Sequence, residues 1–288
     1  MSDELIIRYS LLDDGEMRIF SYGDSRKPPL VCIHGLMGDT VDFISFCKTW
    51  GQKFFLIIPE TAPKGKDSGY MKKESEGHPA LVYEGAVDKI KRFIDKRYPN
   101  QKLLFTGISL GGKLCIEFAG RYPESFKGAV VTDVGVGPLC GSGLYHFLKD
   151  VIPSINLNQE WKELKAELKE KIPDRMLRLL VQSSISYEEG NKKQAQIKGN
   201  MKGFTTALEG SSFEEQHWVL EKLQGQIVIL KATNTSAIKD QDAEVMKNDP
   251  RFFMVDLPGA NHFIQINNRA EYESLGLKAL ELMQDGLL

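Results

Sequence analysis

Apolar residues along the chain alternate between two spacings, one typical of buried strands and one typical of helices. Residues 103–105 form an unbroken apolar run, and the apolar positions after residue 109 recur every three or four residues, at Leu110, Leu114, Phe118 and Tyr122. The same change of spacing occurs along most of the chain. It predicts strands at 30–35, 54–58, 103–105, 128–135, 226–232 and 252–257, and helices at 41–50, 80–98, 110–122, 240–248 and 271–283.

The order of these elements predicts an α/β fold. Short apolar strands that alternate with helices are typical of a mostly parallel sheet with helices on both faces. A strand pair at 5–12 and 17–23, with a turn at 13–16, precedes the alternation. Ligands of such sheets collect at the carboxyl ends of the strands.

The alternation stops between about Gly135 and Leu223, where helical patterns follow one another. One of them places Trp161, Leu164, Leu168 and Ile172 in a single apolar stripe among Lys and Glu residues. We therefore expect a core at 1–134, a helical insertion at 135–223, and the second part of the core at 224–288.

Composition excludes some classes of function. The chain has 288 residues, 42% of them hydrophobic, and a formal net charge of −2. Acidic and basic residues are intermixed, so we expect no nucleic-acid partner. No apolar run reaches the roughly 20 residues that cross a bilayer, and residues 1–10 contain acidic positions, so we expect neither a membrane span nor a signal peptide.

The cysteines indicate a reducing environment. Cys32, Cys47, Cys115 and Cys140 form no C-x-x-C pair, and three of them lie in apolar segments where a thiol packs as a small hydrophobic group. We expect reduced thiols and a cytoplasmic protein.

A serine stands where the strand at 103–105 gives way to the helix at 110–122. The pattern Gly107-x-Ser109-x-Gly111 between a strand and a helix is typical of a nucleophile elbow, in which glycines make room for a strained turn. The helix amides would favour developing negative charge there. The alternative is a solvent-facing serine in an ordinary turn between a strand and a helix.

A serine hydroxyl attacks well only if a base takes its proton. His262 follows the strand at 252–257, and a loop could bring it to Ser109. His78, His146 and His217 lie on helical or loop segments with no partner pattern, which indicates surface or packing roles. The spacing of histidines and carboxylates matches no metal-binding motif, so we predict no metal site.

Three motifs in order resemble those of the α/β-hydrolase fold over nearly the whole chain. They are His34-Gly35, residues 107–112 around Ser109, and residues 258–262, which end at His262. The resemblance implies an eight-stranded sheet, and a helical cap at 135–223 inserted after strand six. It also implies an oxyanion hole formed by the backbone N–H groups of Leu36 and Leu110, with Met37 as a less favoured donor in place of Leu36. His34 would then brace its loop.

The acid of the triad departs from the family pattern. In most relatives it follows strand seven, where this chain has Thr235, Ser236 and Ala237. Asp240 and Asp242 come later, in the predicted helix. Asp133 ends strand six, a position that certain haloalkane dehalogenases use for their acid. We therefore assign Asp133 as the acid that orients His262; the alternatives are that Asp133 merely caps a turn, or that a residue such as Asp240 is the acid.

These residues favour a serine hydrolase that acts on a small to medium carboxylic ester or thioester without a cofactor. The same triad could serve amide, carbon–carbon or peracid chemistry, and a non-catalytic member of the fold could bind a ligand instead. Epoxide and haloalkane hydrolysis are disfavoured, because those relatives carry Asp at the position of Ser109. Cap residues Leu139, Tyr145, Phe147, Trp161 and Trp218 are candidates for the walls of an apolar pocket.

Overall fold

A computed structural model describes residues 10–11, 19–36, 38, 41–61, 80–138, 146–188, 191–197, 216–235 and 237–288. Most of the predicted strand pair near the N-terminus, its turn at 13–16, and residues Met37, His78, Leu139, Cys140, Tyr145 and Ser236 lie outside these ranges. Within them, no helix has both the length and the apolar character needed to cross a membrane.

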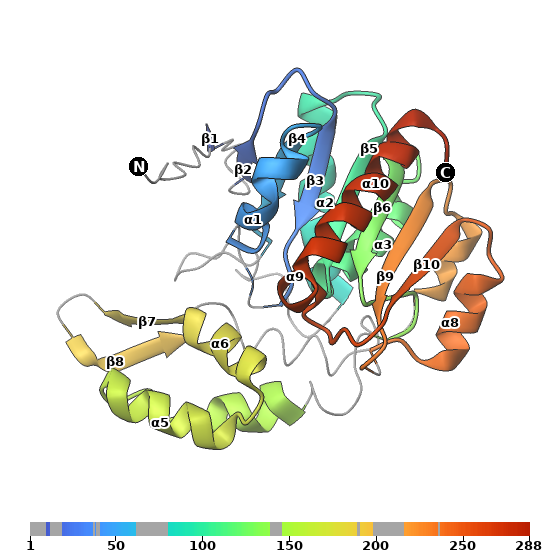
Figure 1. The fold of residues 1–288 in the computed structure, drawn as a ribbon. Coiled ribbons are helices and arrows are strands. Elements are labelled where there is room, and N and C mark those ends of the chain that lie inside the picture. Colours follow the sequence, from blue (N-terminus) through green and yellow to red (C-terminus); the bar gives the residue numbers. More distant parts are fainter. Residues whose placement is uncertain are drawn as a thin grey trace.

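The described strands include a sheet of eight, in the order β1-β2-β4-β3-β5-β6-β9-β10 (Figure 1). β2 pairs antiparallel with β1 and with β4, and the remaining pairs are parallel. The strands are β1 (Ser10–Leu11), β2 (Ile19–Tyr22), β3 (Pro29–Ile33), β4 (Phe55–Pro59), β5 (Leu103–Ile108), β6 (Phe126–Thr132), β9 (Gln226–Ala232) and β10 (Phe252–Leu257). The predicted mostly parallel, eight-stranded α/β sheet is confirmed.

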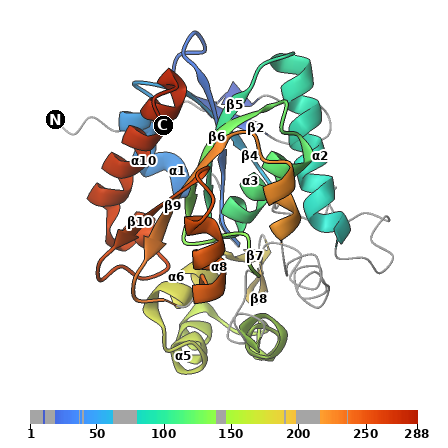
Figure 2. The same cartoon turned by 90° about the vertical axis from the view of Figure 1, so that its right-hand side faces the viewer.

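Helices cover both faces of the sheet (Figures 1 and 2). Side chains alternate between the two faces along a strand. Leu30 and Cys32 of β3 therefore lie in one apolar cluster, and Val31 and Ile33 lie in the other. The first cluster includes α1 (Val41–Trp50) and α10 (Arg269–Asp285). The second includes α2 (Ala80–Arg97), α3 (Leu110–Arg121) and α8 (Asp240–Lys247). A short helix, α9 (Ile264–Asn267), precedes α10.

Between β6 and β9 the chain leaves the sheet and builds a separate group of elements at one end of it (Figures 1 and 2). They are η1 (Phe147–Val151), η2 (Ile152–Ser154), α5 (Trp161–Lys171), α6 (Arg175–Ser183), β7 (Ile185–Glu188) and β8 (Asn191–Ile197), and η4 (His217–Glu221) leads back to β9. The sequence pattern predicted helices here. The antiparallel pair of β7 and β8 is an addition that it missed.

This group has an apolar core of its own. Leu164 and Leu168 of α5 are fully buried in it, as the helical stripe predicts, together with Ile172. Trp161, the first member of that stripe, is instead 39% exposed. Leu36, which follows β3, packs against this core and also against the core of the sheet, so the group contacts a loop at the carboxyl end of β3.

Buried polar groups on α3 hold the chain where it leaves the sheet and where it returns. Lys113 is fully buried, and its Nζ donates to the carbonyl oxygens of Gly135, over 3.0 Å, and Gly137, over 2.6 Å. On the return, the backbone N–H of Gln216 donates to the Val136 carbonyl over 2.7 Å, and the Gln216 side chain donates to the Lys113 carbonyl. The two ends are therefore adjacent and are held by one helix.

Candidate active site

Ser109 lies in the turn between β5 and α3, with a backbone φ of 51°. A positive φ is uncommon for a residue other than glycine and marks local strain. The tight packing of the turn explains the neighbouring glycines. A Cβ atom on Gly107 would overlap the Gly111 carbonyl oxygen, and one on Gly111 would overlap that of Ile33. This strained turn between a strand and a helix is the geometry that the pattern Gly107-x-Ser109-x-Gly111 predicts.

His262 joins this serine to a carboxylate. Its Nε2 lies 2.8 Å from Ser109 Oγ, and its Nδ1 lies 2.8 Å from Asp133 Oδ2. A carboxylate only accepts hydrogen bonds, so Nδ1 carries the proton and Nε2 is free to accept the serine proton. The structure thus brings together the three residues that the sequence analysis named, from β5, β6 and the loop after β10. Asp240, the alternative acid, is the exposed first residue of α8.

Asp133 is fully buried and accepts hydrogen bonds on both of its oxygens. It follows β6 directly and has a φ of 49°. Its Oδ1 accepts from the backbone N–H of Ala232, at the end of β9, over 3.0 Å, and Oδ2 accepts from Thr235 Oγ1 as well as from His262. In the sequence, Thr235 stands where most relatives carry the acid, and no local pattern predicts its hydrogen bond to Asp133.

The two backbone groups assigned to the oxyanion hole lie on segments that pack together. Leu110 begins α3, so its N–H has no acceptor within the helix. Leu36 follows Gly35, and a Cβ atom on Gly35 would lie 3.8 Å from Ser109 Cβ. The loop after β3 therefore lies against the turn that carries the serine.

His34 lies in the same loop and is 1% exposed. Its Nδ1 lies 3.0 Å from the Gly35 carbonyl oxygen, and its Nε2 lies 3.1 Å from Thr61 Oγ1, just past β4. The imidazole therefore links the ends of two neighbouring strands, which suits a structural brace.

Asp42, in the first turn of α1, packs its carboxyl group against this loop. A Cβ atom on Gly38 would overlap Asp42 Oδ2. Burial raises the pKa of Asp42 from 3.8 to about 6. Below pH 4 both the folded and the unfolded chain hold the proton, whereas above pH 6 the folded chain must keep an ionised carboxylate away from water. The folded state therefore loses stability as pH rises from 4 through 6.

Replacing Asp42 with asparagine should remove this cost. A pKa difference of this size corresponds to about 3 kcal/mol, so Asp42→Asn should raise the melting temperature at pH 7.5 by roughly 5 °C and leave it unchanged at pH 4. Thermal unfolding followed by circular dichroism between pH 4 and 8 measures this. Asp240→Asn, at an exposed position in the first turn of α8, is the matched control. A less stable Asp42→Asn at pH 7.5 would contradict the assignment.

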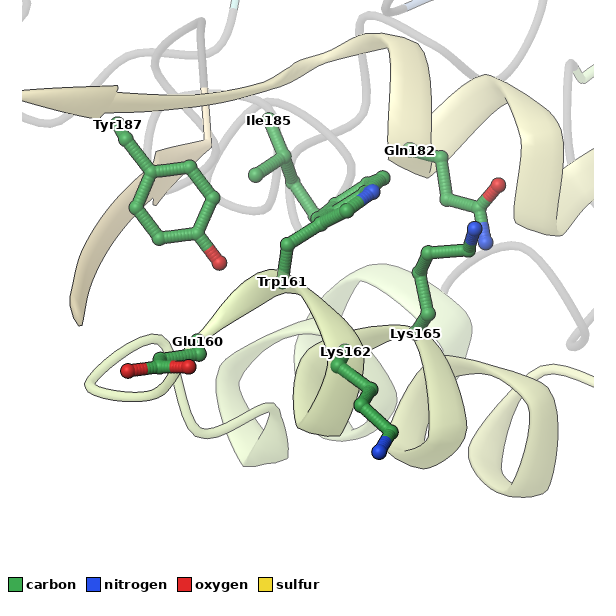
Figure 3. A pocket seen from close by; sticks show the side chains of 7 residues that line it. All are labelled: Glu160, Trp161, Lys162, Lys165, Gln182, Ile185 and Tyr187. Carbon is green, nitrogen blue, oxygen red and sulfur yellow. The ribbon is translucent and has the colours of Figure 1, made fainter. Parts of the chain in front are cut away.

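The candidate wall residues that the structure describes lie in different places. Phe147 is buried in the core of the inserted elements, and Trp218 packs against Gly120 of α3. Trp161 lines a separate cavity of about 800 Å³ among α5, α6 and β7 (Figure 3). There its ring meets that of Tyr187 edge to face, with centroids 6.4 Å apart. Among the residues that the structure describes, this cavity is lined by Glu160, Trp161, Lys162, Lys165, Gln182, Ile185 and Tyr187.

No family model matches the sequence. Solved structures resemble the chain over nearly its whole length. A marine microorganism esterase is 20% identical, with a TM-score of 0.74 over 93% of this chain and 99% of that one. A thioesterase domain from the curacin biosynthetic pathway is 17% identical, with a TM-score of 0.66 over 94% and 99%. An alpha/beta hydrolase from Novosphingobium aromaticivorans is 19% identical, with a TM-score of 0.66 over 96% and 97%.

The protein has the α/β-hydrolase fold.

Proposed function

We propose that this protein is a serine hydrolase that cleaves a small to medium carboxylic ester or thioester through an acyl-enzyme intermediate. The hydrogen-bonded chain from Ser109 Oγ through His262 to Asp133 is the observation that carries the proposal. Such a chain activates a hydroxyl that is otherwise a weak nucleophile. Two of the similar structures are an esterase and a thioesterase, which favours these two classes of bond.

In the proposed acylation step, Ser109 Oγ forms a bond to the carbonyl carbon while His262 Nε2 takes its proton. The Leu36 and Leu110 N–H groups stabilise the oxyanion, and Asp133 stabilises the imidazolium. As the intermediate collapses, the bond to the alcohol or thiol breaks and His262 protonates that leaving group. Water then attacks the acyl carbon while His262 takes a proton from it. The bond between the acyl carbon and Ser109 Oγ breaks, His262 returns the proton to Ser109, and the product acid is released.

We further propose that residues 135–223 act as a cap over this site. The separate apolar core and its contact with Leu36, which follows β3, support a cap that borders the oxyanion loop. A cap in this position would limit the size of the acyl group and exclude water during the reaction.

A fluorophosphonate probe tests the proposed nucleophile. The folded protein should form one covalent adduct at Ser109, located by mass spectrometry of peptides, because the probe reacts with activated serines. Ser109→Ala should form none. Ser154→Ala removes an exposed hydroxyl from η2 and should be labelled like the unsubstituted protein. Turnover of short- and long-chain aryl esters and thioesters, with Ser109→Ala as the blank, then identifies the bond.

Two results would contradict this proposal. One is an unlabelled Ser109 in protein shown by circular dichroism to be folded. The other is hydrolysis of the esters that continues at the same rate in Ser109→Ala.

A further inference from the structure

The proposed acid accepts a hydrogen bond from a side chain on a neighbouring part of the sheet edge. Thr235 lies three residues beyond the end of β9, and its Oγ1 is 3.0 Å from Asp133 Oδ2. The same oxygen lies 2.8 Å from His262 Nδ1. The threonine hydroxyl and the imidazole N–H therefore share one acceptor.

The direction of the Thr235 hydrogen bond is fixed by its neighbours. The backbone N–H of Ala237 donates to Thr235 Oγ1 over 3.1 Å, so the oxygen already accepts one hydrogen bond. The hydroxyl proton is then directed to the carboxylate, which can only accept. Thr235 is thus held as a donor to Asp133 by its own turn.

The segment at the end of β9 holds the carboxylate on both sides. Ala232 donates to Oδ1 from the backbone, and Thr235 donates to Oδ2 from its side chain. Asp133 itself lies at the end of β6, which pairs with β9. The carboxylate is fully buried, and hydrogen bonds to a buried charged group are stronger than those between neutral groups. A carboxylate fixed in this way keeps Oδ2 aimed at the imidazole.

We propose that Thr235 is a positioning residue, which acts through Asp133 to hold His262 in the tautomer and orientation that accept the Ser109 proton. This inference rests on the proposed function. It gives the segment after β9, where most members of the fold carry the acid, a supporting role for an acid that follows β6. In this role the Thr235 hydroxyl acts on His262 and Ser109 through the Asp133 carboxylate.

The rate of fluorophosphonate labelling measures the effect directly. Thr235→Val removes the hydroxyl at nearly constant volume and should slow the maximal labelling rate about tenfold, the cost of one hydrogen bond to a charged group, with little change in the probe concentration at half-maximal rate. Thr235→Ser keeps the hydroxyl and should label within about threefold of the unsubstituted protein. If the valine variant does not fold, Thr235→Ala removes the same hydroxyl without adding bulk.

Testing Thr235→Val in a second parent variant distinguishes an effect that acts through Asp133 from a general structural effect. In Asp133→Ala the carboxylate is gone, so adding Thr235→Val should change the residual labelling rate less than about twofold. A similar tenfold loss in both backgrounds would overturn the inference, as would equal losses for Thr235→Ser and Thr235→Val. If the unsubstituted protein labels at Ser109 but Thr235→Val labels equally fast, this inference fails alone. If the unsubstituted protein does not label, the proposed function fails.

Discussion

Asp133→Asn should slow both the labelling of Ser109 and the turnover of substrate by about 10⁴-fold, the loss typical of a triad whose histidine takes the wrong tautomer. Three described groups form hydrogen bonds to the carboxylate, and each is a donor: the Ala232 N–H, the Thr235 hydroxyl and the His262 Nδ1–H. An asparagine amide would point its own N–H at one of them. If it faces His262, the imidazole proton moves to Nε2, which can then no longer accept the serine proton.

Pre-steady-state labelling and steady-state turnover measure this loss, and circular dichroism establishes that the variant is folded. Asp240→Asn is the matched control, because Asp240 is the other acid that the sequence leaves open, and it should keep the full rate. Near-normal turnover in Asp133→Asn, or loss of turnover in Asp240→Asn, would contradict the assignment of Asp133.

Gly111→Ala should damage both the fold and the site. A Cβ atom at Gly111 would overlap backbone atoms of Ile33 and His34, which cannot turn aside as a flexible side chain can. Overpacking of this kind costs about 3 kcal/mol, which corresponds to a drop of roughly 5 °C in the melting temperature. The loop after β3 must move away from the turn that carries Ser109. This movement would separate the N–H groups of the proposed oxyanion hole, so labelling should also slow at least about tenfold.

Gly85→Ala is a control variant whose stability should change in the opposite direction. Gly85 lies inside α2, and a Cβ atom there meets no described atom within 4 Å outside the neighbouring backbone of its own helix. Because alanine is the better helix former, this variant should be more stable by up to about 1 kcal/mol, with an unchanged labelling rate. Differential scanning calorimetry of both variants makes the comparison. Equal melting temperatures for Gly111→Ala and the unsubstituted protein would show that the turn tolerates a side chain.

The core elements could be predicted because their pattern is local. The strand predicted at 226–232 has the same bounds as β9, since an apolar run in a buried parallel strand is continuous and its ends are marked by polar residues. β7 and β8 were missed because they form a short surface pair. Only one side of each is apolar, with Tyr187 on β7 and Ala195 on β8 among polar neighbours, and such short alternation is hard to distinguish from a loop.

Residues of the site were predictable to different degrees. Ser109 and His262 lie in short motifs, which can be recognised from the residues next to them in the sequence. The contact between Asp133 and Thr235 depends on β6 and β9 being adjacent in the sheet, and the two residues are 102 positions apart. No local pattern encodes that distance. Trp161 was placed on the apolar stripe by its spacing, but the first residue of a helix has no preceding turn to cover it, and it lies partly exposed.

The hydrogen bond between Gln216 and Val136 has a consequence for how proteins of this shape diversify. The polypeptide departs from the sheet and rejoins it at almost the same point, so the intervening stretch can be lengthened, shortened or exchanged over evolutionary time without altering the strand spacing. Lys113 and Gln216 anchor the junction to the same helix that begins beside Ser109. Under the proposed function, selectivity can therefore change while Ser109, His262 and Asp133 keep their alignment.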